Sequence, residues 1–437
     1  MRLVATLAAA CAFWACTGSA AAAIDQESTF QDDNRLIYDT AENVAATLDQ
    51  LATLGVDRVR VTVLWKVVAP DSTSRNRPAF DATDPDSYPP GSWDRYDTVL
   101  RLALERGISV NFNLTGPAPL WATNGSPPRE DIAETFEPSA PEFGLFAQAT
   151  GTRYSGSYTP RGKDAPLPRV DYWAIWNEPN QAGWLTPQWV DDPRGRGPQI
   201  EASPRIYRGL VDAAWEGLRT SGHGDDTILI GETAPKGLNV TGTTRAIKPG
   251  PFIRTLYCLD EALRPLQGTS AEIRGCPVGD NARQRFAEQH PALFRATGWA
   301  HHPYELVRSP TARPKDPDTF TVANLPAFSR LLRGIHGAYG QPIPGGGRDV
   351  PLYLTEFGYQ TAPPDPTGVS LSRQARWLNV AEYLAARNPA VRTLTQFLLD
   401  DDRPLPGRHR NARIAYGSTF QTGLQTDARK RKPAYRS

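Results

Sequence analysis

One unit recurs along this chain: a helix, a glycine, a short apolar strand and then a long polar loop. In a clear copy, a helix predicted over 41–54 places Val44, Leu48 and Leu51 on one face, and Gly55 ends it. An apolar strand over 59–65 follows. Strands that alternate with helices form a parallel sheet covered by helices. The repeat therefore predicts the α/β class of fold.

The unit recurs often enough to close a barrel. With an opening strand near 29–31 we expect eight strands, over 29–31, 59–65, 108–114, 172–176, 227–232, 298–304, 351–357 and 391–399. Eight such units predict a single (β/α)8 TIM barrel, spanning residues 24–437 as one domain. A doubly wound open sheet is the alternative, but no glycine-rich phosphate-binding turn follows any strand.

The long loops are unevenly distributed between the two ends of the predicted barrel. Most of them follow a strand, over 66–92, 115–141, 178–203, 233–250 and 305–322. Such loops emerge at the carboxyl-end face, where barrel active sites are assembled. The long stretch 265–295 instead follows a helix, so we expect it on the opposite face with a structural role.

The first 23 residues differ in character from the rest. A positive start at Met1-Arg2 precedes an apolar run over 3–15 and small residues at 18–23. This pattern predicts a secretory signal peptide over 1–23, and the run is too short for a membrane span. A lipoprotein signal using Cys16 and an uncleaved anchor are the alternatives. We expect a secreted, extracellular monomer.

The net charge limits the kinds of partner molecule, and the cysteine content indicates a disulfide. The 48 basic and 47 acidic residues leave a net charge of +1, which argues against nucleic acid or a membrane surface as partner. After cleavage two of the four cysteines remain, Cys258 and Cys276, and in an exported protein such a pair predicts a disulfide. No metal ligands stand close to them at suitable spacing, and we expect no metal and no cofactor.

Two predicted strands end in a glutamate with aromatic neighbours. The fourth ends in Trp-Asn-Glu-Pro at Glu178, and the seventh in Thr-Glu-Phe-Gly at Glu356. Taken alone, Glu178 is equally compatible with a loop cap or an ion pair. On a barrel, however, both glutamates face one another across the mouth. Two opposed carboxylates in one cleft are what glycosidic bond cleavage requires. The indoles of Trp173 and Trp176 would favour a protonated Glu178.

These motifs resemble the retaining glycosidases of clan A, in particular glycoside hydrolase family 39 and the cellulase-like family 5. The resemblance extends over the predicted mature chain: Arg60 with Trp65 resembles the strand-two segment of family 5, and His302-Pro303-Tyr304 resembles the His-x-Tyr of strand six. It implies a retaining mechanism, with Glu178 as acid and base and Glu356 as nucleophile.

The resemblance also implies supporting roles. Asn177 would contact the sugar 2-hydroxyl, and Tyr304 would hydrogen-bond the nucleophile. We also expect Arg60 among the substrate-binding residues, and its charged guanidinium is suited to stabilise the same carboxylate. The third and eighth strands lack the histidine and the tryptophan that family 5 places there, at 113–116 and 397–400. The sugar and the linkage therefore cannot be carried over.

Other candidates have a second interpretation each. Trp65, Trp121, Trp184 and Trp299 are candidate stacking platforms for sugar rings, or core residues. Adjacent histidines on a strand point to opposite faces, so His302 is a better partner for a sugar hydroxyl than for a metal. Glu232, at the end of the fifth strand, is either a third cleft carboxylate or a structural ion pair. Residues 400–402 are candidates for binding substrate hydroxyls or a calcium ion, but we expect a solvated turn there. We expect a solvated tail over 429–432.

Two other functions remain open. One is a carbohydrate-binding barrel whose catalysis has decayed, although retention of both glutamates with Asn177 and Tyr304 argues against decay. The other is a metal-dependent hydrolase, which would need histidine or aspartate ligands at several strand ends, and only His301-His302 hints at these.

Overall fold

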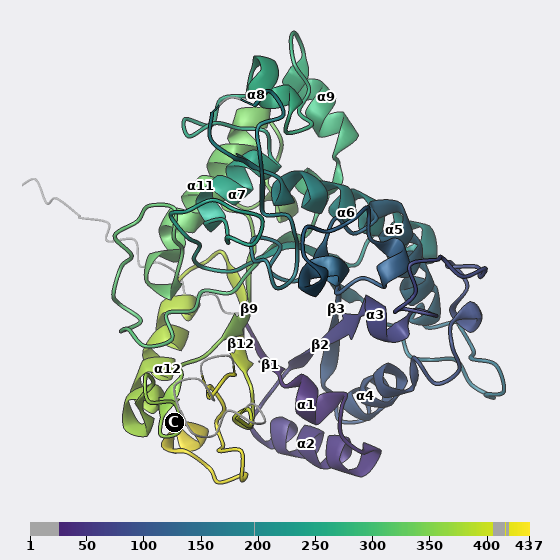
Figure 1. Cartoon of the computed structure of the whole chain (residues 1–437). Helices are drawn as coiled ribbons and strands as arrows, with labels where there is room; N and C mark the ends of the chain where they lie inside the picture. Colours follow the sequence, from purple (N-terminus) through teal and green to yellow (C-terminus); the bar gives the residue numbers. More distant parts are fainter. Residues whose placement is uncertain (1–25, 196, 405–415, 417–418) are drawn as a thin grey trace, which may run out of the picture.

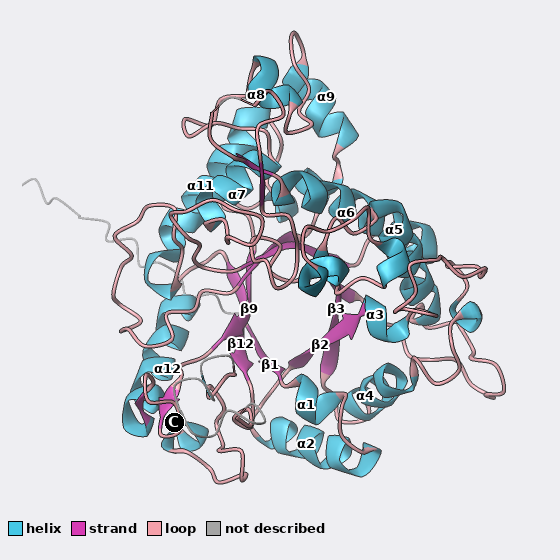
Figure 2. Ribbon diagram, in the orientation of Figure 1, coloured by secondary structure: helices cyan, strands magenta, loops and turns pink. Residues whose placement is uncertain are grey.

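Eight parallel strands form a closed barrel in the computed structural model, which describes residues 26–195, 197–404, 416 and 419–437. The barrel closes because β1 pairs with both β2 and β12. Figure 2 shows the ring of strands with the helices outside it. In spatial order the strands are β1 (Glu27–Gln31), β12 (Val391–Phe397), β9 (Leu352–Phe357), β8 (Gly298–His301), β7 (Thr227–Thr233), β4 (Tyr172–Ile175), β3 (Ser109–Thr115) and β2 (Arg58–Leu64). The predicted TIM barrel is confirmed, and the signal-peptide prediction for 1–23 lies outside the described residues.

Helices cover the outside of the barrel (Figure 1). The longer ones are α2 (Ala41–Thr53), α4 (Asp94–Leu104), α5 (Ala140–Arg153), α6 (Ser203–Leu218), α7 (Pro249–Leu256), α11 (Leu325–Tyr339) and α12 (Leu371–Ala386). The short ones are α1 (Asp33–Leu36), α3 (Trp65–Val68), α8 (Gly268–Glu272), α9 (Ala282–Gln289) and α10 (Ala292–Arg295). The sequence predicts that α7 continues to residue 263, but Cys258 has a φ of 56°, which ends the helix earlier.

Strand alternation decides which side chains reach the inside of the barrel. On β4, Tyr172 and Ala174 join a small interior cluster with Tyr353, while Trp173 points outward and packs against Phe112 of β3. The outward side chains form the large core between strands and helices. At the carboxyl ends of the strands the inward positions carry polar groups, which are therefore held by rigid strands.

The insertion after α7 lies on the outer surface of α6. A disulfide joins Cys258 to Cys276, as predicted. Arg274 Nη2 lies 2.6 Å from Glu201 Oε2, just before α6, and His290 Nδ1 lies 2.6 Å from Asp212 Oδ2 in the middle of α6. The insertion therefore runs up the side of the barrel and is not confined to the opposite face, as the sequence led us to expect.

The chain ends between α12 and α2, where a regular barrel places its eighth helix. In the described residues this position is filled by a short 3₁₀ helix, η7 (Pro433–Arg436), and Gln50 of α2 donates to the Tyr435 hydroxyl at 2.9 Å. A cavity of about 570 Å³ remains between this turn, β1, β12 and α12. Among the described residues we find no helix with the length and apolar character needed to cross a membrane.

Candidate active site

The two glutamates converge at the carboxyl end of the barrel. One carboxylate oxygen of Glu178, one of Glu356 and a ring nitrogen of His302 all lie within 4.8 Å of one another. Both glutamates line a cavity of about 480 Å³. The Glu178 side chain is 21% exposed and that of Glu356 is 11% exposed, so both can reach a bound molecule. The cavity wall also includes Gln31, Asp33, Asn34, Tyr38, Asn177, Trp184, Lys236, Tyr304, Phe397, Asp402 and Phe420.

The backbone around Glu178 is strained. Trp176, Glu178 and Glu232 have φ values of 66°, 36° and 44°, in the left-handed region that ordinary side chains avoid. Each such residue costs on the order of 1–3 kcal/mol and persists only where the surroundings fix it. Here the Glu178 N–H donates to the Glu232 carbonyl at 2.9 Å, which ties the end of β4 to the end of β7. The side chains of Glu178 and Glu232 both contact His302, at 2.9 and 2.7 Å.

Arg60 joins several side chains at the floor of the site, including Gln31. Its Nη1 donates to Glu356 Oε1 at 3.0 Å, and its Nη2 donates to Asn177 Oδ1 at 2.8 Å and to Glu232 Oε2 at 3.1 Å. The side chain is fully buried. Burial acts to lower the pKa of Arg60, but the charges of Glu232 and Glu356 outweigh it and raise the pKa. Arg60 is therefore a permanent cation that orients Asn177 and Glu356.

His302 bridges Glu178 and Glu232. Its Nδ1 lies 2.9 Å from Glu178 Oε1 and 3.6 Å from Glu356 Oε2, and its Nε2 lies 2.7 Å from Glu232 Oε2. Burial by itself lowers the pKa of the ring, but the charge of Glu356 and the contacts with Glu178 and Glu232 raise the pKa of His302 to about 10. At neutral pH both ring nitrogens therefore carry protons and donate to the carboxylates.

The neighbouring histidine behaves in the opposite way. His301 points to the outside of the strands, with Nδ1 2.8 Å from the Thr233 hydroxyl and Nε2 3.0 Å from the Phe320 carbonyl. Burial lowers its pKa to about 3, so the ring is neutral. The two histidines thus face different environments, as strand alternation predicts.

Glu356 is surrounded by hydrogen-bond donors. The Tyr304 hydroxyl donates to Glu356 Oε2 at 3.2 Å, and Arg60 donates to the other oxygen. Burial raises the pKa of Glu356 above its ordinary value of 4.5, while His302 and Arg60 oppose that rise. These donors favour a carboxylate that can attack an electrophile in the cavity.

Glu232 lies behind both glutamates and has no surface. Its Oε2 accepts from Arg60, from His302 and, at 2.7 Å, from the Thr355 hydroxyl. Burial alone would raise the pKa of Glu232, but Arg60 and His302 hold it below the ordinary value. Glu232 is thus an ion-pair partner, as one of our two interpretations held, but inside the active site.

The cluster combines three carboxyl groups with two cations. Glu178, Glu232 and Glu356 face Arg60 and a protonated His302. One proton on one carboxyl group makes the cluster neutral, and a buried cluster is most stable near neutrality. Such a cluster can hold one transferable proton at the cavity surface.

Glu178, His302 and Glu356 together also present oxygen and nitrogen atoms at metal-binding spacing. A metal would need a free nitrogen on His302, because a neutral imidazole is the ligand form. Both nitrogens instead contact carboxylates, and the pKa of His302 is raised to about 10. The residues fit proton transfer better than metal coordination.

The structure corrects several predicted sugar contacts. Trp65, Trp121 and Trp299 are at most 9% exposed, pack in the core and do not line the cavity, so they are not available as stacking platforms. Trp65 packs against Phe143 of α5, for example. Trp184 does line the cavity.

Arg60 and His302 also lack a surface for sugar, because both are fully buried and bind carboxylates. Asn177 and Tyr304 do line the cavity.

Several cavity residues were not predicted from the sequence, among them Asp33 and Phe420. Asp402 lies in the stretch that we expected to be a solvated turn, and Phe420 lies in the C-terminal segment, about which the sequence made no prediction. Lys432, expected in a solvated tail, is buried. In the sequence, the three consecutive aspartates after the eighth strand were the only indication that this part of the chain contributes to the cavity wall.

The comparisons with known proteins concern the fold. No protein-family model matches the sequence, and no curated protein sequence matches it. Among solved structures, a family 39 glycoside hydrolase from Bacteroides cellulosilyticus superposes with a TM-score of 0.50 at 15% identity over 95% of this chain. This chain spans only 63% of that protein.

Two further solved structures show the same barrel. A glucosidase from Croceicoccus marinus gives a TM-score of 0.52 at 14% identity, over 95% of this chain and 68% of that one. A family 1 β-glucosidase from Thermotoga maritima gives 0.51 at 14% identity, over 90% of this chain and 84% of that one. The resemblance to clan A glycoside hydrolases is therefore confirmed for the fold.

Proposed function

We propose that this protein is a secreted retaining glycoside hydrolase that cleaves O-glycosidic bonds of a polysaccharide or oligosaccharide by double displacement. The observation that carries the proposal is the spacing of Glu178 and Glu356, whose oxygens approach within 4.8 Å in one cavity. Retaining enzymes hold their carboxyl groups about 5–5.5 Å apart, whereas inverting enzymes need ~6.5–9.5 Å to admit a water.

In the first step Glu178 gives its proton to the leaving oxygen while Glu356 attacks the anomeric carbon from the opposite face. The bond from that carbon to the leaving oxygen breaks, and an ester to Glu356 forms. Tyr304 and Arg60 hold the attacking carboxylate in place through their hydrogen bonds. Asn177 has its oxygen occupied by Arg60, which leaves its amide N–H groups for the sugar 2-hydroxyl.

In the second step Glu178, now a carboxylate, takes a proton from water, and the water oxygen attacks the anomeric carbon. The ester breaks and Glu356 recovers its charge. During the ester stage Glu356 is neutral and Glu178 is charged, so the net charge of the cluster is unchanged. The hydrogen bond between His302 and Glu178 keeps the Glu178 side chain aimed at the cavity. The two carboxyl groups thus exchange charge between steps, as double displacement requires.

Secretion rests on the predicted signal peptide over 1–23 and is supported by the disulfide Cys258–Cys276, since such bonds persist in oxidising compartments. We propose a monomer that acts on carbohydrate outside the cell.

The test is a hydrolysis screen against polysaccharides and aryl glycosides, with Glu356→Ala as the blank. We expect turnover on at least one substrate by the wild type and its loss in the variant. Near-normal activity in Glu356→Ala would sink the assignment. A decayed carbohydrate-binding barrel, the second candidate, predicts binding without turnover in both proteins.

A further inference from the structure

We propose that the ring of Phe420, which packs at right angles against Phe397, is an aromatic platform for one uncharged pyranose ring of the substrate, and that the buried ion pair Lys432–Asp401 holds it in place. This inference deepens the proposed function and rests on it.

The platform is the outer end of a row of rings that starts at the nucleophile. Tyr304, whose hydroxyl donates to Glu356, lies 6.3 Å from Phe397 at an interplanar angle of 84°. Phe397 lies 5.2 Å from Phe420 at 90°. All three rings line the cavity, and Phe420 is 38% exposed. A sugar bound beyond the reaction centre along this wall meets the open ring of Phe420.

Backbone hydrogen bonds fix Phe420 at this place. Its N–H donates to Asp402 Oδ2 at 2.9 Å, and its carbonyl accepts from the Asp402 N–H at 2.9 Å. Asn34 of α1 donates to the other Asp402 oxygen at 3.2 Å. The backbone of Phe420 is therefore tied to the ends of both β1 and β12, and its ring packs edge-on against Phe397.

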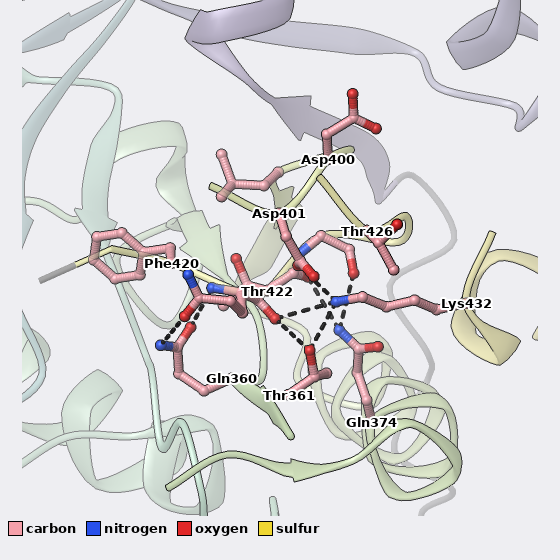
Figure 3. A network of polar contacts seen from close by, with 12 residues as sticks. Gln360, Thr361, Gln374, Asp400, Asp401, Phe420, Thr422, Thr426 and Lys432 are labelled. Carbon is pink, nitrogen blue, oxygen red and sulfur yellow. Dashed lines mark hydrogen bonds and ion pairs between the residues drawn. The ribbon is translucent and has the colours of Figure 1, made fainter. Parts of the chain in front are cut away.

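A buried polar network holds the segment behind Phe420 (Figure 3). Lys432 Nζ donates to Asp401 Oδ1 at 2.6 Å, to the Thr361 hydroxyl at 2.9 Å and to the Gln421 carbonyl at 3.2 Å. The side chains of Lys432 and Asp401 are each 1% exposed. The Gln421 N–H in turn donates to Gln360 at 2.6 Å. Removing one partner of a buried ion pair leaves an uncompensated buried charge, which is strongly destabilising. The Lys432–Asp401 pair therefore fixes this segment against the barrel.

The chemistry of the wall defines the ligand. Aromatic faces pack against the C–H groups of a ring, and the nearby carboxylates of Asp33 and Asp402 line the same cavity and can accept from hydroxyl groups. Burial raises the pKa of both Asp33 and Asp402, but neither group is a cation that could pair with the carboxylate of an acidic sugar. Lys236, a cation in the cavity wall, is already paired with Glu305 at 2.8 Å. The wall therefore suits an uncharged pyranose and not a uronic acid.

The test measures binding by titration calorimetry in the Glu356→Ala background, so that nothing is hydrolysed. The probes are gluco-, xylo- and manno-oligosaccharides of two to six units. The parent protein for comparison is Glu356→Ala. For an oligosaccharide that the parent binds, the additional substitution Phe420→Ala should lower the affinity by about tenfold, which is about 1.4 kcal/mol. Phe420→Trp, which keeps a ring, should stay within roughly twofold. Tyr383→Ala, which removes an exposed ring outside this cavity, is the matched control.

A second pair of variants tests the ion pair. Lys432→Gln should weaken binding as Phe420→Ala does, and Lys430→Gln, at an exposed neighbouring position, should not. Unchanged affinity in Phe420→Ala overturns the platform, and unchanged affinity in a folded Lys432→Gln overturns the role of the ion pair. If the parent binds and the wild type hydrolyses none of the probes or screened substrates, the proposed function itself fails.

Discussion

Replacing Glu232 with glutamine keeps the shape of the side chain and removes its charge. Glu232 Oε2 accepts from Arg60 at 3.1 Å, from His302 at 2.7 Å and from Thr355 at 2.7 Å, although the carboxylate has no contact with the cavity. We expect Glu232→Gln to lower kcat, because both cations that orient Glu178 and Glu356 lose their common anion.

The size of the effect follows from the bond between Glu232 and His302. A hydrogen bond between charged groups contributes about 1.5–3 kcal/mol, and 1.36 kcal/mol corresponds to one pH unit in a titration. The pKa of His302 should therefore fall by about one to two units in Glu232→Gln, and the alkaline limit of kcat that reflects loss of the His302 proton should move down with it.

The same substitution changes the pH dependence of stability. The pKa of His302 is raised from 6.5 to about 10, so its contribution to the free energy of unfolding is full below pH 6.5 and is lost as pH rises to 10. In Glu232→Gln this contribution should be smaller and should disappear at lower pH. Chemical denaturation across this range measures it.

Thr355→Val is the control, because it removes one donor to the same oxygen and leaves the charge. It should shift the alkaline limit far less than Glu232→Gln does. An unchanged alkaline limit in a folded Glu232→Gln would refute the coupling of Glu232 to the catalytic proton.

Three further predictions concern single contacts. Glu178→Ala should lower kcat/KM for dinitrophenyl glycosides far less than for natural substrates, because the dinitrophenolate leaving group needs no proton. Equal losses of kcat/KM on both would remove Glu178 from the acid role. Tyr304→Phe removes a charge-assisted hydrogen bond to Glu356 and should lower kcat by roughly ten- to a hundredfold; a change below about twofold contradicts that contact. Cys258→Ala with Cys276→Ala opens a loop of sequence separation 18 and should lower the free energy of unfolding by about 3 kcal/mol without changing kcat. Unchanged stability would show that the bridge constrains little.

The barrel was predictable because its signals are local and repeated. Apolar strands occur eight times and amphipathic helices separate most of them, so each copy of the unit supports the same interpretation. The path of the insertion after α7 was not predictable, because it depends on ion pairs such as Arg274–Glu201 that join residues far apart in sequence.

The sequence placed Glu178 and Glu356 at strand ends that meet in one cavity, but it misplaced the indoles. Trp299 lies two residues before His301 and therefore shares its outward-facing side of β8, so strand alternation could have assigned Trp299 to the core. The bridging position of His302 was not predictable, because both of its partners come from other strands.

The C-terminal segment shows where composition misleads. A run of basic residues is usually solvated, yet Lys432 finds a buried partner in Asp401. Neither residue reveals this alone, because the pairing depends on how the segment crosses the barrel after β12.

The central claim is that Glu356 forms a covalent bond to the sugar. The most direct measurement uses an activated 2-deoxy-2-fluoro glycoside of the sugar identified in the hydrolysis screen. The fluorine destabilises the charge that develops at the anomeric carbon and slows both steps, while the good leaving group restores the first, so the ester accumulates. Peptide mass spectrometry should find the fluorosugar on Glu356. A label on Glu178 or Glu232, or inactivation without any covalent label, would contradict the mechanism.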